Sequence, residues 1–129
     1  IEGLRIYGTP ACEMNNLRLF YNWAFDEPQY IRESCAKIPK KLDILLGHCP
    51  CYGIQDQLWY NDESCGSKDM LYAVMEKKPK YFVAGHIHEK HGIEKQKHTT
   101  FINAATCNQY NVLLKGDGSL WFDPIVFEI

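Results

Sequence analysis

The sequence predicts a layered α/β domain, in which helices pack on a sheet of short strands. The first half of the chain alternates strand, helix, strand and helix, and this order is typical of α/β domains. Several short strands follow, including a hairpin around a glycine turn that would complete the sheet. With 129 residues, of which 46% are hydrophobic, the chain is expected to form one domain over residues 1–129.

The first half of the chain supplies the alternating elements. In order, we expect a strand over 4–7, an irregular aromatic-rich segment over 11–26, a helix over 28–37 and a strand over 43–46. Pro28 suits the first turn of a helix, because its missing N–H has no helical partner there. Ile31 and Cys35 stand four residues apart and therefore fall on one face of that helix.

The second half begins with a helix and continues with short strands. Ser67 is the expected N-cap of the helix, and Pro79 breaks it. Its apolar stripe, expected to pack in the core and not on a cofactor, consists of Met70, Leu71, Val74 and Met75. The expected strands that follow are Tyr81–Ala84, 92–96, Thr100–Asn103, a hairpin over 113–122 that turns at 116–118, and 125–129.

Two of the expected strands end in the same dipeptide, Gly-His. The strand over 43–46 runs into His48, and Tyr81–Ala84 runs into His86, with His88 two residues further on. Ligands of open α/β sheets bind outside the carboxyl ends of the strands. Imidazole is a common ligand for borderline metals. If the two strands are near neighbours, these three histidines converge as metal ligands; otherwise they are solvated loop side chains.

The six cysteines allow other interpretations. Their even number permits disulfides, but the chain is too large and too apolar to need them. Cys49 and Cys51 form a CxC motif beside His48, although structural zinc sites usually use CxxC. We expect reduced, mostly buried thiols.

Charge and hydropathy exclude several classes of partner. The formal net charge of −2 gives no electrostatic reason to expect binding to duplex nucleic acid or to an anionic membrane. No apolar run approaches the roughly 18 residues of a membrane span. Residues 1–10 lack the basic start and apolar core of a secretory signal. A cytoplasmic location is therefore expected.

Several segments together resemble the calcineurin-like metallophosphoesterase superfamily, and most of all its small group of metallophosphoesterase-domain proteins. The matching segments are IYGTP at 6–10, WAF at 23–25, LDILLGHCPCYGIQD at 42–56, PKYFVAGHIHEKHG at 79–92, TTFINAATCN at 99–108 and PIVFEI at 124–129. The resemblance implies a β-sandwich flanked by helices, in the layer order α/β/β/α. The family's upstream blocks, DxH, GDxxD and GNHD/E, do not occur here, so this chain resembles the C-terminal half only.

The resemblance also implies a metal site. His48 and His86 would ligate one divalent ion and His88 a second, with Mn, Fe or Zn as the ions. Two such ions, about 3.5–4 Å apart, activate a shared water and clamp phosphate oxygens during hydrolysis of phosphodiesters or phosphomonoesters. Asp56 and Asn103 lie in matching segments, where they would orient loops near the site or serve as turn residues. The sequence departs from the family pattern at Cys49, Cys51 and His91.

Three functions stay open at this point. The chain is part of a phosphoesterase acting on a small phosphoester or nucleotide, and an N-terminal half or another chain supplies the missing ligands and covers exposed sheet. Alternatively, it is a degenerate, non-catalytic interaction module of the same fold. As a third reading, the three histidines, with or without a cysteine, build a mononuclear site of another kind.

Overall fold

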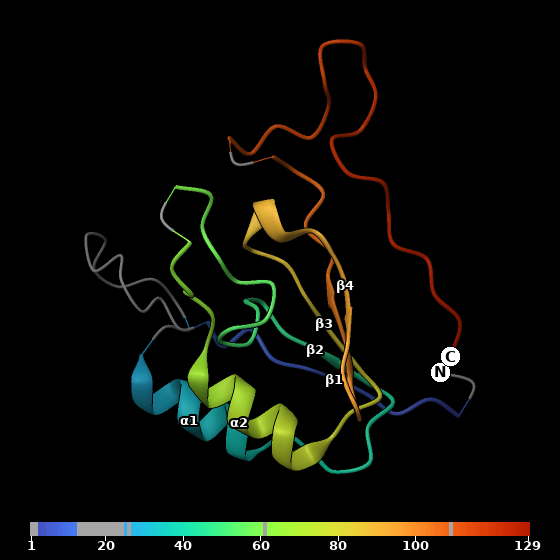
Figure 1. Ribbon diagram of the computed structural model, residues 1–129. Coiled ribbons are helices and arrows are strands. Elements are labelled where there is room, and N and C mark those ends of the chain that lie inside the picture. Colours follow the sequence, from blue (N-terminus) through green and yellow to red (C-terminus); the bar gives the residue numbers. More distant parts are fainter. Residues whose placement is uncertain (1–2, 13–24, 26, 61, 109) are drawn as a thin grey trace.

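The computed structural model describes residues 3–12, 25, 27–60, 62–108 and 110–129 (Figure 1). Most of the segment expected to be irregular, 11–26, lies outside the described residues. The described part forms a five-stranded sheet with two helices, which confirms the α/β class.

The sheet is mixed, and its strands stand in the order β1-β2-β3-β5-β4. The strands are β1 (Ile6–Gly8), β2 (Ile44–Leu46), β3 (Tyr81–Ala84), β4 (Gly92–Lys95) and β5 (Thr100–Asn103). The first three and β5 are parallel, whereas β4 runs antiparallel to β5. The parallel pairing places the carboxyl ends of β1, β2, β3 and β5 along one edge of the sheet.

Helices α1 (Pro28–Ala36) and α2 (Lys68–Lys77) both lie on one face of the sheet (Figure 1). Pro28 stands in the first turn of α1, as expected. The Ser67 side chain accepts a hydrogen bond of 3.1 Å from the Met70 backbone N–H, so the predicted N-cap of α2 is confirmed. Lys78 ends α2 in the left-handed region with φ of 51°.

The core lies between the helices and the sheet. Paired positions on three adjacent strands, Leu45, Phe82 and Phe101, point to the helices and are at most 2% exposed. The helices meet them with Ile31, Cys35, Met70, Ala73 and Val74. Met75 is 58% exposed, so the expected stripe is wrong at that position. Five residues after Met70, its side chain points about 140° away around the helix.

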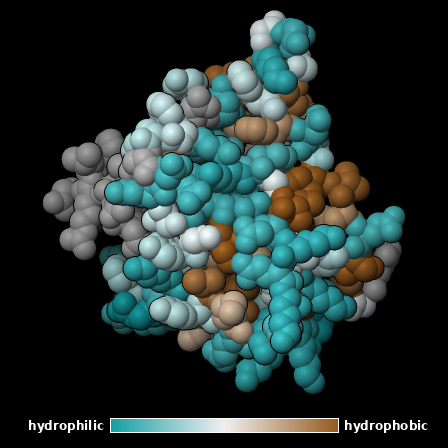
Figure 2. Space-filling view, viewed as in Figure 1, coloured by the Kyte–Doolittle hydropathy of each residue, from teal (hydrophilic) through white to brown (hydrophobic). Residues whose placement is uncertain are grey.

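The opposite face of the sheet is only partly covered. Ile6, Leu46 and Ile93 on this face remain 40%, 43% and 48% exposed. Figure 2 shows apolar side chains on the side of the molecule that faces away from the helices. The C-terminal segment passes here, where the Phe127 ring stacks on Tyr81 at 4.7 Å and the Tyr81 hydroxyl donates to a backbone carbonyl at 2.9 Å. Among the described residues there is one sheet, so the second layer of the expected sandwich is not formed by them.

The C-terminal predictions were partly wrong. The hairpin over 113–122 is reduced to a single antiparallel bridge between Leu114 and Leu120. Residues 125–129 form no strand, and Val126 is 89% exposed. The apolar composition of this segment favoured a strand, but in the described structure its backbone pairs with neither edge strand, β1 or β4.

Two further observations concern the whole of the described chain. None of its helices has the length and apolar character to cross a membrane. None of the six cysteines, all of which lie in described positions, forms a disulfide, as expected.

Candidate metal centre

The two Gly-His segments meet at the carboxyl edge of the sheet. Because β2 and β3 are parallel neighbours, the loops that follow them begin side by side. The Gly47 N–H donates to Val83 O at 2.8 Å, and the Gly85 N–H donates to His48 O at 3.1 Å. A Cβ on Gly47 would lie 2.8 Å from the Phe82 ring, so this position requires glycine. The strand neighbourhood on which the convergence of the histidines depended is therefore present.

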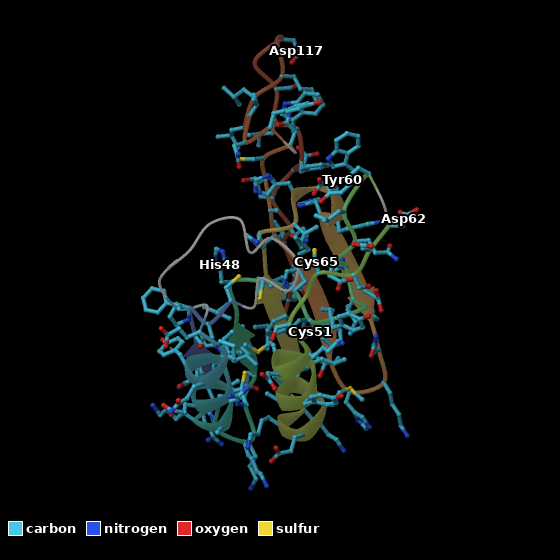
Figure 3. All side chains as sticks on the ribbon, turned by 90° about the vertical axis from the view of Figure 1, so that its left-hand side faces the viewer. His48, Cys51, Tyr60, Asp62, Cys65 and Asp117 are labelled. Atoms are coloured by element: carbon cyan, nitrogen blue, oxygen red, sulfur yellow. The ribbon has the colours of Figure 1, made fainter. Side chains whose placement is uncertain are left out.

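Cys12, His48 and His86 form a compact group of potential ligands. One ligand atom from each lies within 4.8 Å of the others. The two imidazole rings stand 4.8 Å apart at their centroids and are tilted by 48°. Cys12 is buried, His86 is half-buried and His48 is exposed, so the group opens toward solvent on one side. In Figure 3, His48 projects at the level where the strands end, above the two helices.

The sequence prediction omitted Cys12. The residue follows β1, the third parallel strand, and the Thr9 N–H donates to Leu46 O at 3.0 Å, which holds this loop beside the end of β2. The Ala11 N–H donates to the Thr9 hydroxyl at 3.3 Å and tightens the turn just before Cys12. The rule that pointed to the histidines, ligands after the carboxyl ends of parallel strands, extends to Cys12 once β1 is known to pair with β2.

His86 is set up as a neutral ligand. Burial lowers the pKa of its imidazole, and the nearby His48 and His88 lower it further. The neutral ring is the form that binds metals. Its backbone adopts φ of 69°, a left-handed conformation that is uncommon for residues other than glycine.

His88 lies outside this group of three. It opens the short 3₁₀ helix η1 (His88–Lys90), and its Nδ1 donates to Asn108 O at 2.7 Å. A carbonyl can only accept, so Nε2 is the nitrogen left for a ligand. The role of His88 as a ligand of a second ion stays a prediction. Nearby, His91 Nδ1 donates to Ala105 O at 2.8 Å, and the His91 ring stacks on Phe122 at 4.9 Å between centroids. These two contacts hold the His91 ring in place within the fold.

Asp56 holds the loop that follows β2. Its carboxylate is fully buried, and one oxygen accepts from the N–H groups of Gly53 and Gly66 at 2.8 and 2.9 Å. Within the described part of the chain, the other oxygen has no hydrogen-bond partner. Cys65 donates through its Sγ to the Asp56 backbone carbonyl at 2.8 Å. The Asp56 carboxylate is thus directed at the backbone of its own loop.

Asn103 joins two loops at the end of β5. Its side-chain N–H₂ donates to Ile87 O at 2.7 Å and to Gln55 O at 3.3 Å. Its side-chain oxygen accepts from the Ala105 N–H at 3.1 Å. The loops after β2 and β3, which carry the two Gly-His segments, are therefore tied to each other beside the histidines. This arrangement supports the interpretation that Asn103 orients loops near the site.

The CxC motif does not join the group around His48. Cys49 and Cys51 are buried at 1% and 0% exposure, and burial raises the pKa of the Cys51 thiol well above its usual range. Burial also raises the pKa of Cys65 to about 11, and the Asp56 carboxylate adds to this shift. In Figure 3, Cys51 lies lower than His48, and Cys65 lies at a similar height but to one side of it. The raised pKa values keep the Cys51 and Cys65 thiols protonated at neutral pH, and a protonated thiol is a poor metal ligand.

The donor atoms fit one ion better than two. Within the described residues, the group of Cys12, His48 and His86 is the set of three or more potential ligands that come close enough for one ion. No carboxylate of the described part joins it, whereas a two-ion site needs a bridging oxygen ligand. A pair of ions therefore requires ligands beyond those that the described residues bring together.

In comparisons with known proteins, the chain matches part of several longer proteins. No protein-family model matches it. It is 37% identical over 131 residues to UPF0046 protein C25E10.12 of Caenorhabditis elegans, covering 98% of this chain and 43% of that protein. It is 34% identical over 110 residues to human metallophosphoesterase domain-containing protein 1, covering 83% of this chain and 32% of that protein. The chain thus spans less than half the length of these curated relatives.

The resemblance to metallophosphoesterase-domain proteins is confirmed. A solved crystal structure also shares the fold, with a TM-score of 0.50 and 18% identity, over 78% of this chain and 39% of that structure. At this identity the structural match speaks for the fold alone. The partial coverage agrees with a chain that corresponds to a portion of such a protein.

Proposed function

We propose that this chain contributes part of the active site of a metal-dependent phosphoester hydrolase. The observation that carries the proposal is the meeting of His48 and His86 at the carboxyl edge of parallel strands. The similarity to proteins named for a metallophosphoesterase domain supports it. The substrate class we infer is a small phosphodiester or phosphomonoester, with nucleotides included.

The histidines of the chain would hold the ions. His48 and His86 would ligate one divalent ion, and His88 would offer Nε2 to a second, since Nδ1 is engaged by Asn108. Mn, Fe and Zn accept imidazole ligands and are the candidates. When bound, such ions activate a water and neutralise phosphate charge. Neutral imidazoles leave the ionic charge uncompensated, which favours an anionic substrate.

The remaining ligands would come from outside the described residues. We infer that a further polypeptide segment, an N-terminal half or another chain, supplies carboxylates to the histidine edge. The same segment would cover the open face of the sheet, where Ile6, Leu46 and Ile93 are partly exposed. Exposed apolar sheet surface of this kind favours association with another layer.

Hydrolysis assays test the proposal. The chain is assayed alone and as part of any longer polypeptide that carries it, with p-nitrophenyl phosphate and bis-p-nitrophenyl phosphate in the presence of Mn, Fe or Zn. We expect metal-dependent turnover from the longer protein, a loss of at least about 100-fold in His86→Ala, and no loss in the control His98→Ala, an exposed histidine away from this edge. Metal binding without turnover in every form would contradict the proposal and favour the non-catalytic module.

A further inference from the structure

The loop after β1 brings the Cys12 thiol close to His48 and His86. This cysteine is not part of the CxC motif, and the proposed hydrolase site does not use it. We propose that Cys12, His48 and His86 form a mononuclear thiolate–imidazole site that binds Zn²⁺. The inference concerns metal binding alone and does not depend on phosphoester hydrolysis. It differs from the proposed two-ion site in its third ligand and in the number of ions.

The donor set selects the class of metal. Two neutral imidazoles and one thiolate form a borderline-to-soft set that suits Zn²⁺ and Co²⁺ and disfavours Mg²⁺ and Ca²⁺, which need oxygen ligands. Binding would release the Cys12 proton, because only the thiolate is a metal ligand.

The geometry requires little movement. A tetrahedral zinc ion, with bonds of about 2.05 Å to nitrogen and 2.3 Å to sulfur, separates its ligand atoms by about 3.3–3.6 Å. The three atoms already lie within 4.8 Å of one another. Side-chain rotations of His48 and His86 would therefore close the remaining distance of roughly 1–1.5 Å. The rings are tilted by 48° and not stacked face to face, so both can turn a nitrogen to a common point.

The surroundings define the shape of the site. Cys12 is buried at 8% exposure, and its N–H donates to Phe25 O at 3.2 Å, which fixes the backbone of its loop. His48 is exposed, so the group is open to solvent at this residue. A fourth coordination position would therefore face solvent, as in zinc sites that keep a position for water or substrate.

Cobalt(II) spectroscopy tests the inference with the 129-residue chain. Metal-free protein is titrated with Co²⁺, and the near-ultraviolet thiolate-to-cobalt charge-transfer band is recorded. We expect saturation at one equivalent per chain, a band that Zn²⁺ abolishes by displacing cobalt, and no band in Cys12→Ser. The affinity of Cys12→Ser for Zn²⁺ should fall by at least about tenfold. Cys107→Ser, which replaces a half-buried thiol in the loop after β5, should keep the band and the affinity.

Two results would overturn the inference. One is a charge-transfer band that survives in Cys12→Ser, and the other is saturable cobalt binding without any such band. Thermal unfolding of metal-free Cys12→Ser, expected to match that of the unmodified chain, shows that a lost band reflects a lost ligand and not a lost fold. Two bound ions with no thiolate band would contradict this site while leaving the hydrolase proposal intact.

Discussion

The core between the sheet and the helices and the carboxyl edge of the sheet differ in the side chains that form them. In the core, Leu45, Phe82 and Phe101 pack against the helices and are at most 2% exposed. At the carboxyl edge, His48 is exposed, His86 is half-buried, and buried polar side chains bond to loop backbone. The interior therefore provides the stability of the described fold. The edge provides ligand atoms, at positions where the backbone is held by hydrogen bonds and not by apolar packing.

The largest effect on stability should come from the interior. Leu45→Ala removes a fully buried side chain between β2 and the helices and should lower the free energy of unfolding by about 2–5 kcal/mol. Leu46→Ala, one residue along the same strand, is the matched control. Its side chain is 43% exposed on the other face, so the loss should stay below about 1 kcal/mol. Urea denaturation of both variants measures the difference, and equal losses would contradict the assignment of the core to the helix side.

The next largest loss of stability should come from removing the hydrogen bonds by which Asp56 holds the loop after β2. Asp56→Ala removes the carboxylate oxygen that accepts from the exposed Gly53 N–H and the buried Gly66 N–H, and should cost about 2 kcal/mol. The loss is moderated because the carboxylate oxygen without a partner disappears as well. Asp62→Asn, on the exposed outer part of the same loop (Figure 3), should change stability by less than about 0.5 kcal/mol. A neutral outcome for Asp56→Ala in chemical denaturation would remove the scaffold role that its hydrogen bonds indicate.

A substitution among the histidines at the carboxyl edge should change metal affinity while leaving the stability of the metal-free protein nearly unchanged. His48→Ala removes an exposed side chain, so the metal-free protein should lose less than about 0.5 kcal/mol. The same variant should lose at least about tenfold in Zn²⁺ affinity, because it lacks one of the three ligands. Calorimetric titration with Zn²⁺, beside urea denaturation in a chelator, gives both quantities. Unchanged affinity, with His98→Ala as the control, would count against His48 as a ligand.

The last prediction concerns neither stability nor metal binding but the chemical reactivity of Cys65 and its dependence on pH. With a pKa raised to about 11, this thiol is on the order of 0.1% ionised at pH 8, whereas an ordinary thiol is about a quarter ionised. Alkylation by iodoacetamide at Cys65, followed by mass spectrometry, should be on the order of 100-fold slower than in urea-unfolded chain. The rate should climb steadily from pH 8 to pH 10, since the thiolate fraction grows as pH approaches the pKa. A plateau near pH 9 would show an ordinary thiol and an open loop.

The sequence was a better guide to strands than to the loops between them. Short apolar runs ending in glycine predicted β2 and β3 closely, because a buried strand leaves a local pattern. The shared Gly-His ending predicted that His48 and His86 meet on the condition that the two strands are neighbours, and β2 and β3 are neighbours. Cys12 escaped the prediction because its place depends on how β1 pairs with β2, and a single cysteine leaves no periodic signal.

The C-terminal segment illustrates the opposite failure. Residues 125–129 have the composition of a strand, but a strand also needs a partner with free backbone groups. In the described structure this segment contacts the sheet through side chains, with Phe127 stacked on Tyr81, and not through a ladder of hydrogen bonds. Composition indicates that a segment can bury apolar side chains, but it does not indicate whether the backbone will run along an edge strand, here β1 or β4, or cross the face of the sheet.

The first measurement to make is the metal content per chain. It shows whether the ends of the parallel strands bring metal ligands together. Protein purified without chelator is examined by elemental analysis, alongside the double variant His48→Ala/His86→Ala prepared in the same way. We expect a divalent transition metal, close to one equivalent or more per chain, in the unmodified protein and only traces in the double variant. A metal-free protein that also fails to take up Zn²⁺, or equal metal in both preparations, would contradict it.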